Sequence, residues 1–213
     1  RLRLQPLMAL LEKRKVDLIQ RELAVREMAR RRLIAFALRM MPTYKAGWVH
    51  KEIAAKMEQF MKDVQEGKSP RLIIQQPPRS GKSQLGSVFF PAWILGRHPN
   101  WEIISASYSA SLAISFSRQV RATMRSDEFK SIFRDVKLDD ETQSAEGWKT
   151  TKGGGYLPVG VGGPATGRGA HVLIIDDPVK NAEEAESETT REAIKDWYRT
   201  TAYTRLAPGG GVI

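Results

Sequence analysis

The stretch RLIIQQPPRSGKSQ (71–84) decides the predicted fold, because a strand-like apolar run leads directly into a loop rich in proline and glycine. Within it, QPPRSGKS (76–83) matches the pattern G-x-x-x-x-G-K-[ST], except that Gln76 replaces the first glycine. A helix-like run follows over residues 81–96, in which Pro91 is an expected kink or break. This match is credible because a strand precedes the glycine-containing loop and a helix follows it.

The residue types of this loop indicate a site for ATP and Mg²⁺. Backbone N–H groups and the positive end of the following helix bind phosphate oxygens, and Gly81 allows the close approach. Lys82 is expected to place its ammonium on the β- and γ-phosphates, and the Ser83 hydroxyl is expected to ligate Mg²⁺. The rest of the predicted nucleotide-binding loop is Gln76, Pro77, Pro78, Arg79 and Ser80. The alternative is a chance GKS in a strand-to-helix turn.

A second segment, HVLIIDDP (171–178), ends an apolar strand in two carboxylates. Asp176 is expected to hold Mg²⁺, and Asp177 to orient and polarise the attacking water, where glutamate is commoner. The alternative is a pair of helix-capping aspartates before Pro178.

Further candidate residues lie outside these two segments. Arg168 lies between two glycines in GPATGRGAH (163–171), so it can reach a γ-phosphate of its own or a neighbouring subunit. Trp48 and His50 are candidates for stacking on or contacting adenine. The alternatives are a surface arginine in a turn, and core or helix-capping residues at positions 48 and 50.

Strands and helices alternate along the remaining chain, which predicts an α/β fold with a mainly parallel sheet, helices on both faces and N-terminal helices before it. The predicted strands and hairpin cover 71–76, 101–108, 148–163, 171–177 and 209–213, and the predicted helices cover 4–40, 49–65, 81–96, 109–126 and 187–204.

The amino-acid composition limits the kinds of site and partner that this chain can have. The chain of 213 residues has no cysteine, which excludes disulfides and thiolate sites, and its three histidines are far apart, so any metal should be a hard cation held by oxygen. The net charge is +10, and residues 1–40 hold 11 Lys and Arg against 4 Asp and Glu. This imbalance indicates a polyanionic partner, with a solvated helix face as the alternative. No apolar run is long enough to span a bilayer.

The chain resembles the large terminase subunits of tailed phages. The segments that carry the resemblance are RLIIQQPPRSGKSQ, SYSASLAISFSRQVR, GVGGPATGRGAHVLIIDDPVKNAEEAES and DWYRTTAYTRLAPGGGVI, from about residue 44 to the end. The resemblance implies an ASCE-type, RecA-like P-loop ATPase that forms a ring on a portal protein and drives double-stranded DNA into a procapsid. It also implies a small terminase subunit as partner, no membrane, and a location in the bacterial host cytoplasm and transiently on the procapsid.

The resemblance also assigns roles and domains. Arg79 matches the loop arginine, Asp176 the Walker B carboxylate and Asp177 the position of the usual catalytic glutamate. Arg168 lies where some members have an arginine finger that acts on the neighbouring subunit. We expect a basic helical region at 1–42 and an ATPase domain at 43–213. The chain is expected to be a fragment, with residues before Arg1 and without the C-terminal nuclease domain of the family, so no nuclease activity is expected from it.

Two other functions remain open at this point. One is a P-loop helicase or nucleic-acid remodelling ATPase, which requires a second RecA-like domain. The other is a nucleotide-gated binding module with little turnover, which the shorter Asp177 favours over a full ATPase.

Overall fold

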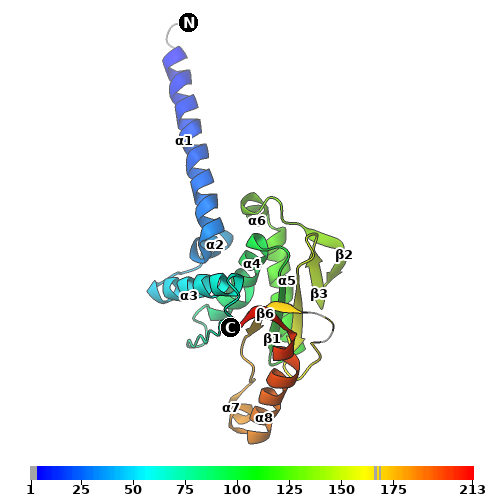
Figure 1. Ribbon diagram of the computed structural model, residues 1–213. Coiled ribbons are helices and arrows are strands. Elements are labelled where there is room, and N and C mark those ends of the chain that lie inside the picture. Colours follow the sequence, from blue (N-terminus) through cyan, green and yellow to red (C-terminus); the bar gives the residue numbers. More distant parts are fainter. Residues whose placement is uncertain (1–3, 166, 168) are drawn as a thin grey trace.

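A six-stranded sheet forms the centre of the computed structural model, which describes residues 4–165, 167 and 169–213. The strand order is β2-β3-β4-β1-β5-β6 (Figure 1). Neighbours among β4, β1, β5 and β6 pair in parallel, whereas β2 and β3 form an antiparallel edge. The mainly parallel sheet is therefore confirmed. The strands are β1 Glu102–Ser107, β2 Leu138–Ser144, β3 Gly147–Thr150, β4 Gly155–Gly160, β5 Ala170–Ile175 and β6 Leu206–Val212.

Helices cover both faces of this sheet, as predicted. Ile103 of β1 and Ile174 of β5 pack in one apolar cluster with α4 (Phe90–Arg97) and α5 (Ala110–Arg125). The alternate residues Ile104 and Leu173 pack in a second cluster with Trp197 and Ala202. Trp197 belongs to α8 (Glu188–Trp197), and Ala202 belongs to the π-helical segment η2 (Tyr198–Ala202). Because both faces are buried, most residues of β1 and β5 are buried, including Ser105 and Ser107 of β1.

The N-terminal region is not one helix over residues 4–40, so that prediction is wrong in one respect. The chain breaks at Arg32 between α1 (Leu4–Arg31) and α2 (Leu33–Met40), because Arg32 has an extended backbone. Glu58 stabilises the break: its carboxylate accepts hydrogen bonds from Leu33 N at 2.7 Å and from Arg32 Nε at 2.9 Å. Glu58 belongs to α3 (Trp48–Gln65), which confirms the helix predicted at 49–65.

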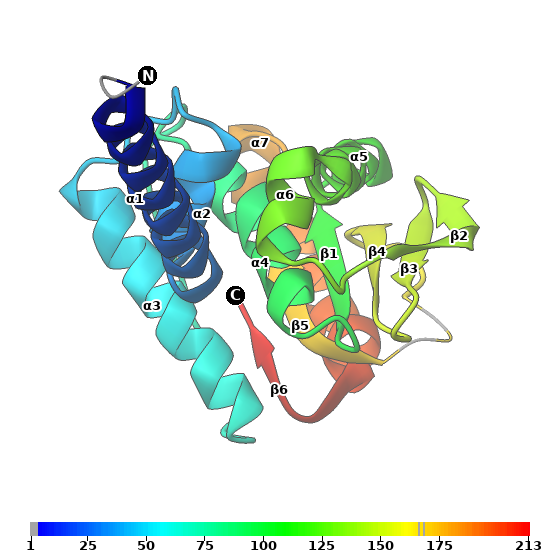
Figure 2. The same cartoon turned by 90° about the horizontal axis from the view of Figure 1, so that it is seen from above.

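The two views show how these helices lie relative to the sheet. α1 projects away from the body in Figure 1, and α2 turns back toward the sheet-bearing part of the molecule. Seen from above, α1, α2 and α3 lie on the side of the molecule next to β6 (Figure 2). Leu33, Phe36 and Ala37 of α2 are fully buried in the main apolar cluster. In the part of the chain that the structure describes, no helix combines the length and apolarity needed to cross a membrane.

The segment 71–76 is not a strand, contrary to prediction. It is extended, but it forms only one parallel bridge, between Arg71 and Val212. Val212 N donates to Pro70 O, and Leu72 N donates to Val212 O, both at 3.0 Å. Among the described residues, which end at Ile213, no further bridge pairs residues 72–76 with β6. An apolar run without a continuing hydrogen-bonded neighbour stays extended but unpaired.

The helix predicted over 81–96 forms, but its irregularity precedes Pro91. Residues Gln84–Phe89 are a π-helical segment, η1, which continues into α4 with Pro91 in its first turn. Proline has no N–H and its ring clashes with the carbonyl four residues earlier. A π-type turn widens the helix at that point and relieves the clash.

The remaining predictions are mostly confirmed, with shifted boundaries. The strand at 101–108, the helix at 109–126, the hairpin at 148–163 and the strand at 171–177 all form. β6 begins at Leu206 rather than at 209, and the helix predicted at 187–204 changes to η2 and then to the 3₁₀ turn η3 (Tyr203–Arg205). The elements α6 (Asp127–Ile132), α7 (Ala182–Glu186) and β2 were not predicted. β2 is an edge strand whose charged sequence, LDDETQS, hides the strand pattern.

A stack of three rings closes the amino-terminal end of the parallel strands. Trp101 lies between His98, with ring centroids 4.3 Å apart, and His171, at 5.4 Å. Burial, with Arg97 and His171 nearby, lowers the pKa of His98 to about 4. His98 Nε2 is buried and has no hydrogen-bond partner among the described residues.

We expect acid to destabilise the fold through His98. The unfolded chain protonates this histidine near its ordinary pKa of about 6.5, whereas the folded chain resists protonation down to about 4. The free energy of unfolding should therefore be unaffected by His98 above pH 6.5 and should fall as the pH drops from 6.5 toward 4. Urea unfolding at a series of pH values checks this, and His98→Asn should flatten the profile in that window. An unchanged profile in the variant would contradict this role.

Candidate functional site

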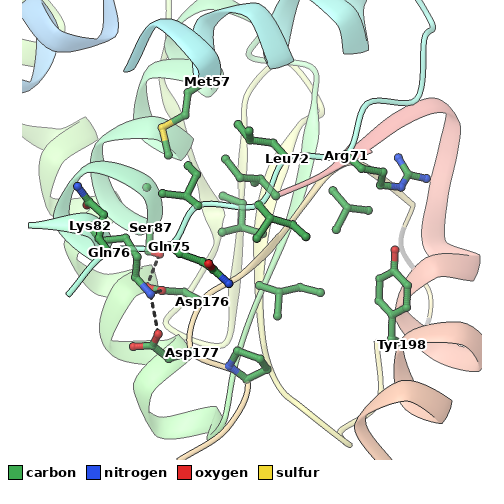
Figure 3. Close-up of a pocket in the computed structure, with 18 residues that line it drawn as sticks. Met57, Arg71, Leu72, Gln75, Gln76, Lys82, Ser87, Asp176, Asp177 and Tyr198 are labelled. Carbon is green, nitrogen blue, oxygen red and sulfur yellow. Dashed lines mark hydrogen bonds and ion pairs between the residues drawn. The ribbon is translucent and has the colours of Figure 1, made fainter. Parts of the chain in front are cut away.

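The loop after residue 76 and the end of β5 meet at one point, although the two segments lie far apart in the sequence. Lys82 Nζ is 3.1 Å from Asp176 Oδ1 and 2.6 Å from Asp177 Oδ1 (Figure 3). Both aspartates directly follow β5, at the carboxyl end of the parallel strands, where ligands commonly bind in open α/β sheets. The structure thus brings together the lysine and the two carboxylates that the sequence selected.

The two carboxylates differ in exposure, which gives them different environments. The Asp176 side chain is 7% exposed and that of Asp177 is 58% exposed. Ser87 Oγ donates a buried hydrogen bond of 2.7 Å to Asp176 Oδ2, so both oxygens of Asp176 have partners. Asp177 faces solvent and has a backbone φ of 49°, a left-handed conformation that is uncommon for a residue other than glycine.

Burial and the two aspartates act in opposite directions on the pKa of Lys82. Burial acts to lower the pKa of Lys82, but hydrogen bonds and charge from Asp177 and Asp176 outweigh it and raise the pKa. The ammonium therefore remains charged at neutral pH. A charged lysine beside two carboxylates can exchange these partners for the oxygens of a phosphate.

A cavity of about 710 Å³ opens beside this cluster, which is within the usual size range of small-ligand sites. Its polar end holds Gln76, Lys82, Ser87, Asp176 and Asp177 (Figure 3). The remaining walls are mainly apolar and come from the extended segment 71–75, the end of β5, the end of β6 and the side chains of Met57, Pro178 and Tyr198.

The loop itself has the backbone conformation that the pattern requires at Gly81. The φ of Gly81 is +84°, which favours glycine, and Arg79 has a positive φ of 61°. Ser80 Oγ donates to Gln76 Oε1 at 3.2 Å across the loop, so Gln76 closes the turn from the position where the pattern has glycine. The chain becomes helical at Lys82, which directs the helix amino terminus at the loop.

The other predicted residues are distributed around the loop. Pro77, Pro78 and Arg79 are exposed, and Ser83 is half-buried and is not among the residues that line the cavity. Trp48, at the start of α3, is 80% exposed. His50 lies against the loop, with Nε2 2.7 Å from Ser80 O. Arg168 lies outside the described residues, so its role as an arginine finger stays a prediction.

Sequence reasoning missed two residues at this site. Ser87 follows Ser83 by four residues, which is one helical turn, so the spacing of GKSQLGS was an available signal for a second hydroxyl on that face. Tyr44 donates from its hydroxyl to Gly81 O at 3.4 Å, and no motif marked it.

The donor groups fit Mg²⁺ that arrives with a triphosphate. Among the described residues, no group of three or more His, Cys, Asp or Glu forms a cage for a metal ion. Mg²⁺ in nucleotide sites takes one or two carboxylates together with phosphate oxygens and water. A buried carboxylate at Asp176, a second at Asp177 and a charged lysine match that requirement.

Replacing Ser87 should destabilise the protein more than replacing Ser83. Ser87→Ala removes the donor to a buried carboxylate oxygen, at an expected cost of about 1.5–3 kcal/mol in the free energy of unfolding. Ser83→Ala, one turn earlier on the same helix, is the matched control and should change it by about 0.5 kcal/mol or less. Denaturant unfolding measures both. Equal effects would show that the hydrogen bond to Asp176 contributes little.

Comparison with known proteins identifies the family. No curated protein matches the chain. The family model described as terminase large subunit, T4likevirus-type, N-terminal matches residues 73–212, a range that includes Lys82, Asp176 and Asp177. The match spans well over half of the chain and contains both segments that meet at the cavity. The chain therefore belongs to the T4likevirus-type terminase large subunits and corresponds to their N-terminal region.

Proposed function

We propose that this chain is the ATP-hydrolysing motor domain of a terminase large subunit, which uses ATP and Mg²⁺ to move double-stranded DNA into a procapsid. The observation that carries the proposal is the contact of Lys82 with Asp176 and Asp177 at the mouth of one cavity. Membership of the terminase family supports the packaging role.

The sheet topology supports an ASCE-type, RecA-like P-loop core. The bridge between Arg71 and Val212 places the segment that leads into the loop beside β6, and β6 in turn pairs with β5. The lysine and the acidic pair therefore come from segments separated by an intervening strand. This places the phosphate loop and the acidic strand end on the same edge of the sheet.

The environments of the site residues support a division of roles. When bound, Mg²⁺ neutralises phosphate charge, and Asp176 would hold it together with the predicted ligand Ser83. Lys82 would leave the carboxylates and bind β- and γ-phosphate oxygens, which frees Asp176 and Asp177. Asp177, the more exposed carboxylate, would orient the attacking water. Arg79 on the loop adds a second cation for the phosphates.

The partners and location follow from the family and from charge. The basic residues of α1 and α2 suit a polyanion such as DNA. A portal protein, a small terminase subunit and a ring of identical subunits are the partners that a packaging motor requires. The corresponding location is the bacterial host cytoplasm and, transiently, the procapsid.

Lys82→Ala tests the proposal directly. It removes the ammonium from the predicted β- and γ-phosphate position, so ATP turnover should fall by about 10²-fold or more while the chain remains folded. Phosphate release measures the turnover, and circular dichroism measures the fold. Turnover close to that of the unmodified chain would remove the basis for the assignment. DNA-stimulated turnover of the unmodified chain would separate a motor from a nucleotide-gated binding module.

Replacing Asp177 should affect turnover, whereas replacing Asp176 should affect binding. Asp177→Asn should keep the affinity for ATP with Mg²⁺ and lower turnover by about 10²–10⁴-fold, because the group that acts on water is lost. Asp176→Asn should weaken Mg²⁺-dependent binding itself, because the buried metal ligand loses its charge. Equilibrium titration of nucleotide at several Mg²⁺ concentrations, together with turnover, measures both effects. The reverse pattern would exchange the two roles.

A further inference from the structure

The first turn of α3 lies against the phosphate loop through His50. His50 Nε2 is 2.7 Å from Ser80 O, and Gly47 N donates to His50 Nδ1 at 3.1 Å. Because Nδ1 accepts a hydrogen bond, the proton of the neutral ring must be on Nε2, which donates to Ser80 O. Both ring nitrogens of His50 are therefore occupied within the protein.

Tyr44, whose ring packs beside His50, contacts the next residue of the same loop, Gly81. Its hydroxyl donates to Gly81 O at 3.4 Å, and its ring packs edge-on against His50 with centroids 5.5 Å apart. A Cβ atom on Gly81 would lie 3.2 Å from this ring, so the loop backbone packs directly on the tyrosine. Phe89 of η1 packs edge-on against Tyr44 at 6.1 Å and anchors the ring in the main apolar cluster.

These contacts have a consequence for the N–H groups of the loop. A trans peptide is planar, and its C=O and N–H point in opposite directions. The hydrogen bond to Ser80 O fixes the peptide that carries Gly81 N–H. Gly81 O accepts from Leu85 N at 3.0 Å and from the Tyr44 hydroxyl, and these bonds fix the peptide that carries Lys82 N–H. Both N–H groups are therefore directed away from Tyr44 and His50.

We propose that His50 and Tyr44 are positioning residues that hold two carbonyl groups of the phosphate loop, so that the N–H groups of Gly81 and Lys82 face the phosphates. The role rests on the proposed ATP site and adds to it, since no sequence pattern assigned any function to Tyr44. It differs from the direct contact with adenine that the sequence suggested for His50. Under the positioning role, His50 contributes to binding of the triphosphate and not of the base.

Inorganic tripolyphosphate separates the two roles, because it has the phosphates of ATP and no base. We would measure dissociation constants for ATP and for tripolyphosphate, each with Mg²⁺, in the unmodified chain and in variants. His50→Ala should weaken both by the same factor, about tenfold, because the Ser80 carbonyl loses its donor. Tyr44→Phe should weaken both equally and by less, because Gly81 O loses the 3.4 Å hydrogen bond from Tyr44 but keeps the 3.0 Å hydrogen bond from Leu85 N.

Two further variants control for indirect effects. His50→Gln should restore binding to near the unmodified level, since its amide offers an acceptor to Gly47 N and a donor to Ser80 O. Val49→Ala, in the same helical turn, should bind both ligands like the unmodified chain. If His50→Ala fails to fold, as judged by circular dichroism, Tyr44→Phe still tests the proposal.

The outcomes decide between distinct conclusions. Weaker binding of ATP with unchanged binding of tripolyphosphate would overturn the proposal in favour of a contact with the base. Unchanged binding of both ligands in His50→Ala and Tyr44→Phe would also overturn it. If the unmodified chain binds neither ligand, the proposed ATP site fails, which is a separate result from failure of the positioning role.

Discussion

The site depends on one electrostatic constraint, which is that a carboxylate buried at the end of a strand needs partners for its charge. Asp176 has two, the ammonium of Lys82 and the hydroxyl of Ser87, and both come from the helix that begins at the phosphate loop. Leaving one partner of such a group unpaired in the interior costs several kcal/mol. The requirement therefore fixes the start of that helix against the end of β5, and it sets the depth of the cavity between them.

Much of the fold could be predicted because its strongest signals are local. β5 is mostly apolar, β1 contains the apolar residues Ile103, Ile104 and Ala106, and helix-like runs separate the two segments, so their existence and parallel pairing followed from the sequence. The segment 71–76 is extended rather than a strand because a strand also requires a hydrogen-bonded neighbour, and among the described residues it forms one bridge, between Arg71 and Val212. The break at Arg32 was equally invisible, because Glu58, 25 residues after Leu33, accepts the N–H that begins α2.

The candidate site shows the same division between local and long-range information. Gly81, Lys82, Asp176 and Asp177 could be selected because they lie in short motifs, and the structure places Lys82 beside both aspartates. Tyr44 and Ser87 were missed because their roles arise only when other segments pack beside them: 37 residues separate Tyr44 from Gly81, and 89 separate Ser87 from Asp176. The ring of His50 bonds to the loop backbone in the structure, and its predicted contact with adenine stays a prediction.

One helix, α3, contacts both the loop at Ser80 and the junction between α1 and α2. At its amino terminus His50 holds the phosphate loop, and two turns later Glu58 holds the junction of α1 and α2. Between them, Met57 lines the cavity and Ala54 is buried in the main cluster. A helix fixed at both places moves as one body, because its internal hydrogen bonds resist bending. Together with the direct packing of Phe36 of α2 against Phe89 of η1, α3 therefore connects the N-terminal helices to the loop that leads into Lys82.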